Sequence, residues 1–144
     1  MGARERLVRA LVDSSVLIAL ARPKESRHQE VIEALSAEQP GGLAVPVTIL
    51  SETMSFLGAR VGIDGQRAFW DAFMRSDLAV SAVDLPLMET AREIDRRYAD
   101  AGFGFADCTL LAACEATRSA RIYTFDTRLA AYRPSFAPAL QLLP

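Results

Sequence analysis

The fold is decided by residues 102–115, which read GFGFADCTLLAACE. Two glycines lead into an apolar run with the composition of a buried helix. Asp107 falls in the expected first turn of this helix, where unpaired backbone N–H groups favour a negative charge. Taken alone, Asp107 is a helix-start residue. Acidic residues at three comparable places in the chain give it a second interpretation, as part of a cation site.

Length and composition indicate an ordinary globular domain. The chain has 144 residues, of which 51% are hydrophobic and 24% charged, so we expect a single domain over residues 1–144. A net charge of −2 argues against a protein that coats nucleic acid by bulk electrostatics, although a local site stays open. The apolar runs fall short of the roughly 20 residues of a membrane span, and the N-terminal MGARERLVRALVD has no signal-peptide features. We therefore expect a cytoplasmic protein that does not contact a membrane.

The cysteine and histidine content offers no competing chemistry. Cys108 and Cys114 lie six residues apart on one expected helix, point to different faces and are expected to stay buried thiols. No CxxC metal signature is present. His28 is the lone histidine, and we interpret it as a surface residue.

Short apolar runs alternate with helical patterns along the whole chain. The expected strands cover residues 7–12, 43–47, 78–83, 121–125 and 140–143. This alternation predicts an α/β fold, with a central, mostly parallel sheet of about five strands between two helical layers. The crossovers that join parallel strands are expected to be right-handed.

Several helix starts can be read from polar residues that follow the strands. The trio 13–15 (DSS) can cap a helix over 16–20, Ser26 can start the next, and Thr48 is expected to cap a helix that carries Glu52 in its first turn. A later helix, after residue 84, pairs Glu93 with Arg97. A wide apolar stripe on the helix from residue 63 serves either the core or a partner surface; it consists of Phe69, Trp70, Phe73 and Met74.

Four acidic residues fall where the carboxyl ends of the strands should meet. Asp13 and Asp126 directly follow expected strands, while Glu52 and Asp107 lie near helix starts that should reach the same edge. Two carboxylates about 5 Å apart repel by about 3 kcal/mol at an effective dielectric near 20, so four together favour a cation. Oxygen ligands suit Mg²⁺ or Mn²⁺, which orient and deprotonate a water and neutralise charge on a phosphoryl group.

The order and context of these acids resemble the PIN-domain family, and within it the VapC-like toxins of toxin–antitoxin pairs. The resemblance rests on four segments, LVDSSVLIAL (11–20), TILSETMSFL (48–57), GFGFADCTLLAACEA (102–116) and YTFDTRLAAY (123–132). It implies a PIN-like three-layer fold and a metal-dependent endoribonuclease that cleaves RNA by water attack and leaves a 5′-phosphate. It also implies a homodimer and a small antitoxin that blocks the active site. Two positions depart from the family's usual pattern: Ser15 stands where Asn is common, and Gly104 where Ser or Thr is common.

The resemblance assigns roles to individual residues. Asp13, Glu52 and Asp107 are expected to hold a catalytic Mg²⁺ or Mn²⁺ ion directly or through water. Asp126 would complete the site or hold a second ion. Two hydroxyl residues, Ser15 and Thr124, are expected to support these ligands. Arg128 is either a contact to substrate phosphate or a surface residue, and Glu115 is expected outside the site.

Other functions remain open at this point. A PIN-fold nuclease of RNA maturation would share every motif, and a non-catalytic module that binds RNA or protein would share the fold. A phosphatase usually has DxD after the first strand, where this chain has Asp13-Ser14-Ser15. A receiver-like domain needs a lysine at the site, and Lys24 is the only lysine.

Overall fold

The computed structural model describes residues 7–144 and contains one five-stranded parallel sheet. Its strand order is β3-β2-β1-β4-β5. The strands are β1 (Ala10–Val12), β2 (Leu43–Pro46), β3 (Ala79–Ser81), β4 (Arg121–Tyr123) and β5 (Gln141–Leu143). The predicted α/β fold with a central parallel sheet is confirmed, although each strand is shorter than the apolar run that predicted it. Residues 1–6, part of the stretch considered for a signal peptide, lie outside the described residues.

The middle strand explains why the first apolar run has no polar alternation. Leu11 of β1 is in register with Ala44 of β2 on one side and Ile122 of β4 on the other. All three residues of β1 are fully buried, because helices cover both faces of a parallel sheet. β1 is therefore the centre of the core.

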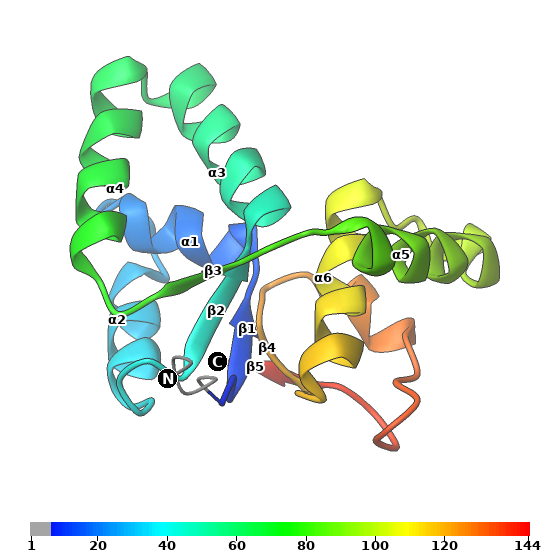
Figure 1. Cartoon of the computed structure of the whole chain (residues 1–144). Coiled ribbons are helices and arrows are strands. Elements are labelled where there is room, and N and C mark those ends of the chain that lie inside the picture. Colours follow the sequence, from blue (N-terminus) through cyan, green and yellow to red (C-terminus); the bar gives the residue numbers. More distant parts are fainter. Residues whose placement is uncertain (1–6) are drawn as a thin grey trace, which may run out of the picture.

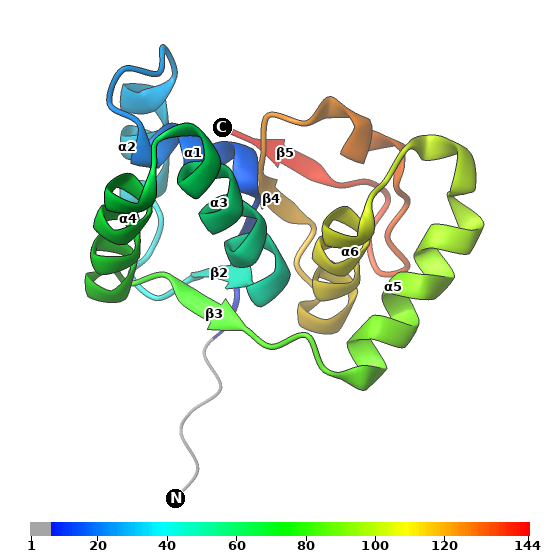
Figure 2. The same ribbon diagram turned by 90° about the horizontal axis from the view of Figure 1, so that it is seen from above.

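Two groups of helices enclose the sheet (Figures 1 and 2). The helices are α1 (Ser14–Ala21), α2 (His28–Ser36), α3 (Val47–Arg60), α4 (Ile63–Arg75), α5 (Leu85–Arg97) and α6 (Phe105–Thr117), with short 3₁₀ helices η1 (Ala99–Ala101) and η2 (Thr127–Ala131). Helices α1 to α4 lie on one side of the sheet, and α5 and α6 on the other. The α3–α4 pair projects beyond the sheet, as Figure 1 shows.

Three predictions about helix starts and helix pairs are wrong. Helix α3 begins at Val47 with Pro46 as its N-cap residue, so Thr48 does not cap it and Glu52 falls in the second turn. Proline is compatible with this place because a helix start needs no N–H there. Helix α2 begins at His28 rather than Ser26. Glu93 pairs with Arg96 at 3.6 Å, one residue earlier than expected.

Other side chains differ less from expectation. His28 is half-buried rather than fully on the surface, and its Nδ1 lies 2.8 Å from the Ala19 carbonyl oxygen. Cys108 and Cys114 are buried free thiols, as predicted. Among residues 7–144, no helix combines the length and apolar character needed to cross a membrane.

The apolar stripe of α4 divides between core and surface. Phe69 and Phe73 are buried, and their ring centroids lie 6.0 Å apart. Trp70 and Met74 are 55% and 71% exposed. Half of the predicted stripe therefore packs within the molecule, and the other half faces outward.

Candidate active site

Asp13 is the most buried acid of the four. It follows β1, caps α1 and is only 3% exposed. Its backbone N–H donates to the Tyr123 carbonyl oxygen at 2.9 Å, which fixes it against the end of β4. Its Oδ1 accepts the Ser14 backbone N–H at 2.8 Å. The site is therefore built around a carboxylate held at the junction of two central strands.

Hydroxyl groups occupy the other oxygen of Asp13. Thr124 donates to Oδ2 at 2.7 Å, and Ser15 lies 3.4 Å from the same atom. The Thr124 oxygen also accepts the Asp126 backbone N–H at 2.9 Å, while Ser15 accepts the Phe125 N–H at 3.0 Å. These contacts suit the supporting role expected for Ser15 and Thr124, and that role stays a prediction.

Opposing influences act on the pKa of Asp13. Burial has the largest effect and raises this pKa, whereas the hydrogen bonds from Thr124 and Ser14 lower it. The negative charges of Asp107 and Glu52 raise it further, and the pKa lies above its ordinary value. The charges of two other predicted acids, Asp107 and Glu52, therefore act on Asp13.

Asp107 is the helix-start residue that its sequence position predicts, and its part in a cation site stays a prediction. It lies at the third position of α6, and its Oδ2 accepts the Gly104 backbone N–H at 2.9 Å. This bond satisfies a free donor at the helix start. Its side chain is 16% exposed, so the carboxylate also reaches the surface of the site. Asp107 is thus a helix-start residue that faces the other acids.

Asp126 is engaged by an arginine of its own segment. Arg128 Nη2 lies 2.6 Å from Asp126 Oδ2, and Nε lies 3.0 Å from Oδ1. The hydrogen bond from Arg128 is the largest cause that lowers the pKa of Asp126. The same guanidinium reaches Asp107 Oδ2 at 3.5 Å. We call Asp13, Glu52, Asp107 and Asp126 the acidic cluster. Arg128 contacts two of these acids and is therefore not a detached surface residue.

Glu52 lies on α3, a helix that packs against α6. It is an exposed residue of the second turn, four residues after Thr48 and therefore on the same helix face. Thr48 Oγ1 lies 2.6 Å from Thr109 Oγ1. Since the Thr109 hydroxyl donates to the Ala106 carbonyl at 2.7 Å, Thr48 is the donor between the two. Sequence patterns gave no signal for this pair.

The oxygen ligands of the four acids fit a hard divalent cation, but their carboxylates are not gathered closely enough to hold one. All four predicted ligands are carboxylates, which Mg²⁺ and Mn²⁺ prefer. The charges of Glu52 and Asp107 both raise the pKa of Asp13. Within residues 7–144, no three acidic, histidine or cysteine side chains are placed to hold a metal ion together. Binding an ion between them requires side-chain movement.

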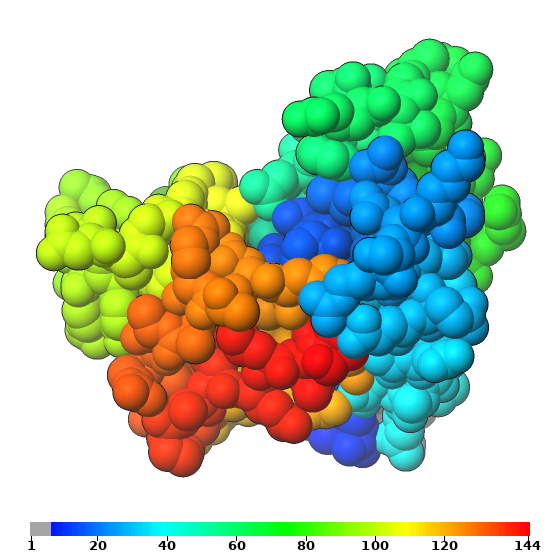
Figure 3. Space-filling model, turned by 180° about the vertical axis from the view of Figure 1, so that it is seen from behind, coloured from blue at the N-terminus to red at the C-terminus, as the bar shows by residue number. Residues whose placement is uncertain are grey.

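The surface is hollowed on the side of these acids. Figure 3 shows a notch between α4 and the α5–α6 pair, with α1 and η2 near its base. Those two elements begin directly after Asp13 and Asp126.

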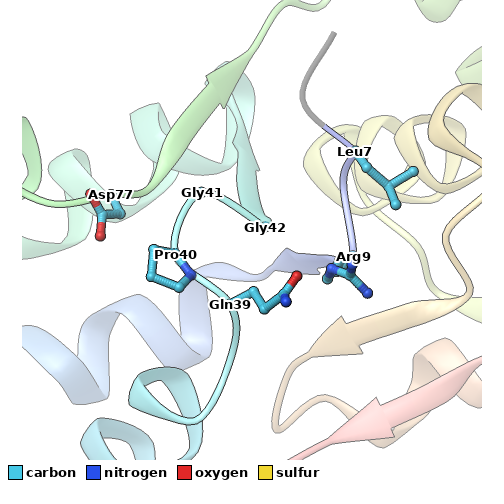
Figure 4. Close-up of a pocket in the computed structure, with 7 residues that line it drawn as sticks. All are labelled: Leu7, Arg9, Gln39, Pro40, Gly41, Gly42 and Asp77. Carbon is cyan, nitrogen blue, oxygen red and sulfur yellow. The ribbon is translucent and has the colours of Figure 1, made fainter. Parts of the chain in front are cut away.

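A second hollow lies at the opposite edge of the sheet. Its volume is about 400 Å³, and Arg9, Gly42 and Asp77 line it where strands begin (Figure 4). None of the four predicted acids lines it. It is therefore separate from the candidate active site.

One basic residue beside the site has no sequence signal. The Arg27 guanidinium carbon lies 3.7 Å from the ring centroid of Phe125. In the sequence, Phe125 stands between the predicted site residues Thr124 and Asp126. Arg27 precedes α2 and forms an ion pair with Glu30 at 3.0 Å. The contact depends on how α2 packs beside the end of β4, which no local pattern encodes.

Comparison with known families identifies the chain. The family model of the PIN domain matches residues 10–133. The chain belongs to the PIN domain family. The match includes the four segments in which the acids lie, and it confirms the predicted resemblance. No curated protein matches the chain.

Solved structures of toxins and toxin–antitoxin complexes share the fold. VapC20 of Mycobacterium tuberculosis, a toxin that cleaves the sarcin–ricin loop, is 23% identical over 90% of this chain and 98% of its own, with a TM-score of 0.79. A toxin–antitoxin complex from Klebsiella pneumoniae is 21% identical over 82% and 87%, with a TM-score of 0.62. DNA-bound VapBC from Salmonella typhimurium is 14% identical over 94% and 96%, with a TM-score of 0.68. These likenesses show that the PIN-like fold extends over nearly all of the chain.

Proposed function

We propose that this PIN domain protein is an endoribonuclease that needs Mg²⁺ or Mn²⁺ and serves as the toxin of a toxin–antitoxin pair. The observation that carries the proposal is the buried Asp13 carboxylate, whose pKa is raised by burial and by the charges of Asp107 and Glu52. Folding such a group beside two others of the same sign is unfavourable unless a proton or a positive ligand neutralises part of the charge, and a divalent cation can do so at neutral pH. Family membership and the fold of VapC proteins add support.

Each acid would have a defined part in the reaction. Asp13 and Asp107, with Glu52 directly or through water, would hold the cation, and Asp126 would complete the site. A bound divalent cation supplies a water of lowered pKa and neutralises charge on the phosphoryl group. Thr124 and Ser15 would keep the Asp13 oxygens oriented through the contacts described above. The fixed position of Asp13 lowers the reorganisation needed when substrate binds.

The proposal extends to partners and location. An RNA strand would enter the notch of Figure 3, a small antitoxin would cover the acidic cluster, and the protein would act as a homodimer in the cytoplasm. The support for the antitoxin is the family together with the solved toxin–antitoxin complexes that share the fold.

Purified protein tests the catalytic part directly. A mixed RNA pool incubated with protein should be cleaved in Mg²⁺ or Mn²⁺, with 5′-phosphate ends, and should stay intact in chelator or with Asp107→Asn. Mn²⁺ at a hundred times its dissociation constant should stabilise the fold by about 2.7 kcal/mol, a melting rise of roughly 5 to 10 °C. Coincident melting curves with Mn²⁺ and chelator, together with intact RNA, would contradict the proposal.

Expression in a host cell tests the biological part. The wild-type protein should arrest growth, whereas Asp13→Ala should not. Equal growth of the two strains at equal protein levels would contradict the toxin role, and a nuclease of RNA maturation would then be the better interpretation of a protein that still cleaves RNA.

A further inference from the structure

Arg128 is the only cation seen in contact with the acidic cluster among residues 7–144. Its guanidinium forms five hydrogen bonds or ion pairs that reach two separate segments. On one side, Nε and Nη2 bind both oxygens of Asp126, at 2.6 to 3.2 Å. On the other side, Nη1 donates to the Gly102 carbonyl oxygen at 2.6 Å, and Nη2 lies 3.5 Å from Asp107 Oδ2. Arg128 thus joins the segment after β4 to the start of α6.

The contacts are unequal in strength. Two donors engage Asp126 in a bidentate arrangement, the strongest form of arginine–carboxylate pair. The contact with Asp107 is longer, at the limit of hydrogen-bond distance. A competing cation would therefore remove Asp107 from Arg128 more readily than it would remove Asp126.

The position of Arg128 makes movement inexpensive. Its side chain is 52% exposed, whereas those of Asp107 and Asp126 are 16% and 21% exposed. The guanidinium can therefore turn into solvent without opening the core. Gly102 has a φ of 77°, a conformation that glycine adopts without strain, and its carbonyl gives Arg128 a second anchor.

We propose that Arg128 is the internal counter-charge of this site, which holds Asp107 and Asp126 in the ion-free protein and releases Asp107 when a divalent cation binds. The inference rests on the proposed function, because it assigns the cation to Asp107. It explains why several acids can face one another before a cation arrives, and why no three of them are placed as a ligand set among the described residues. Arg128 acts here as a positioning residue that competes with the cation.

Cation affinity in a matched pair of variants tests this role. Arg128→Gln should bind Mn²⁺ roughly two- to fivefold more tightly than wild type in calorimetric titration, since an exposed ion pair no longer competes. Arg96→Gln removes the same charge from an exposed pair with Glu93 on α5 and should leave the affinity unchanged. Unchanged or weaker Mn²⁺ binding by Arg128→Gln would overturn the inference.

A measurement on the wild-type protein keeps the inference testable if Arg128→Gln is unstable. The Nη–H signals of Arg128 in a low-temperature ¹⁵N NMR spectrum should shift on titration with Mg²⁺, because Nη2 makes the contact with Asp107, while those of Arg96 should not shift. A stationary Arg128 signal at saturating Mg²⁺ would contradict release of Asp107.

The outcomes separate this inference from the proposed function. If wild type binds Mn²⁺ and cleaves RNA but Arg128→Gln has the same affinity, only the role of Arg128 fails. If neither protein binds Mn²⁺, both proposals fail. If Arg128→Gln binds Mn²⁺ where wild type binds none, the counter-charge role is supported in its strongest form.

Discussion

At Asp13, burial and hydrogen bonding act on one carboxyl group in opposite directions. Burial has the largest effect and raises its pKa, whereas the hydrogen bonds from Thr124 and Ser14 lower it. Loss of the Thr124 donor would leave Asp13 Oδ2 with only the longer Ser15 contact at 3.4 Å, and a buried oxygen that lacks a full partner costs more than the net worth of the lost bond. Thr124 has the larger part because its hydroxyl also accepts the Asp126 N–H. One threonine therefore orients two of the four acids.

Replacing Thr124 with valine should weaken both stability and cleavage. The shape is kept, but Asp13 loses a donor and the Asp126 N–H loses its acceptor. We expect a loss of about 1 to 3 kcal/mol in the free energy of unfolding and a decrease of about 10- to 100-fold in RNA cleavage. Urea unfolding and a cleavage assay measure the two effects. As a control, Thr117→Val removes a hydroxyl at the far end of α6 and should leave cleavage unchanged. Cleavage by Thr124→Val within twofold of wild type would contradict the role of Thr124 in orienting Asp13 and Asp126.

Asp107→Asn separates the two roles of Asp107. The amide oxygen can still accept the Gly104 N–H, but the negative charge at the helix start is lost, at a cost of about 0.3 to 1 kcal/mol. Cleavage should nearly vanish. Asp84 caps α5 by accepting the Leu87 N–H, so Asp84→Asn should cost similar stability and leave cleavage intact. Equal loss of cleavage in both variants would reduce Asp107 to a structural residue.

Among the elements, the contact between α3 and α6 matters most for the site. The Thr48–Thr109 hydrogen bond joins the two helices at 2.6 Å, one turn before Glu52 and two residues after Asp107. Thr109 is fully buried and Thr48 half-buried, so water reaches this bond from one side only. The two acids therefore lie on helices that are held together beside them.

Thr48→Val should loosen this contact. Thr109 keeps its own bond to the Ala106 carbonyl, so the expected cost is about 1 kcal/mol. In a double-mutant cycle with Thr109→Val, the coupling free energy should reach about 0.5 kcal/mol or more. Denaturant unfolding gives these values, and Thr90→Val on the exposed face of α5 is the control. A coupling free energy near zero would show that packing alone holds the two helices.

At the scale of the whole molecule, a second polar cluster joins the helical layer to strand β4. It consists of Glu38, Arg121 and Tyr123. Glu38 follows α2, and its Oε1 accepts hydrogen bonds from Arg121 and Tyr123 of β4. The hydrogen bond from Arg121 is the largest cause that holds the pKa of Glu38 below its ordinary value of 4.5, although burial acts in the other direction. Glu38 thus links the first helical layer to the central sheet.

This cluster predicts an acid-sensitive contribution to stability. Because the folded pKa of Glu38 is lowered, its contribution is fully present above pH 4.5 and is lost as the pH falls through the folded pKa. Glu38→Gln should lower the free energy of unfolding by about 1 to 2 kcal/mol at pH 7. Below pH 4.5 the wild type should lose stability more steeply than the variant, as measured by urea unfolding at each pH. Parallel pH curves would contradict the prediction, and Glu89→Gln at an exposed position is the control.

Local sequence patterns were sufficient to predict the order of strands and helices along the chain and the parallel sheet. Alternating apolar runs and helix starts predicted five strands and the parallel sheet, because a strand buried on both faces must be apolar throughout, as β1 is. Asp13 and Asp126 could be placed at one edge for a related reason: both directly follow strands, and parallel strands end on the same side. These features depend on residues that are neighbours in the chain.

Tertiary structure decided the contacts within the site. Arg128 binds Asp126 and reaches Asp107, twenty-one positions away in the sequence, and Thr48 meets Thr109 across two helices. The start of α3 at Val47 moved Glu52 into the second turn. Such contacts arise from how separate elements pack, and hydrophobic periodicity records only which face of an element is buried. The sequence therefore determined which acids approach the edge of the sheet, and only the packing of helices and loops decided that Arg128 reaches two of them and that Thr48 and Thr109 join the helices beside them.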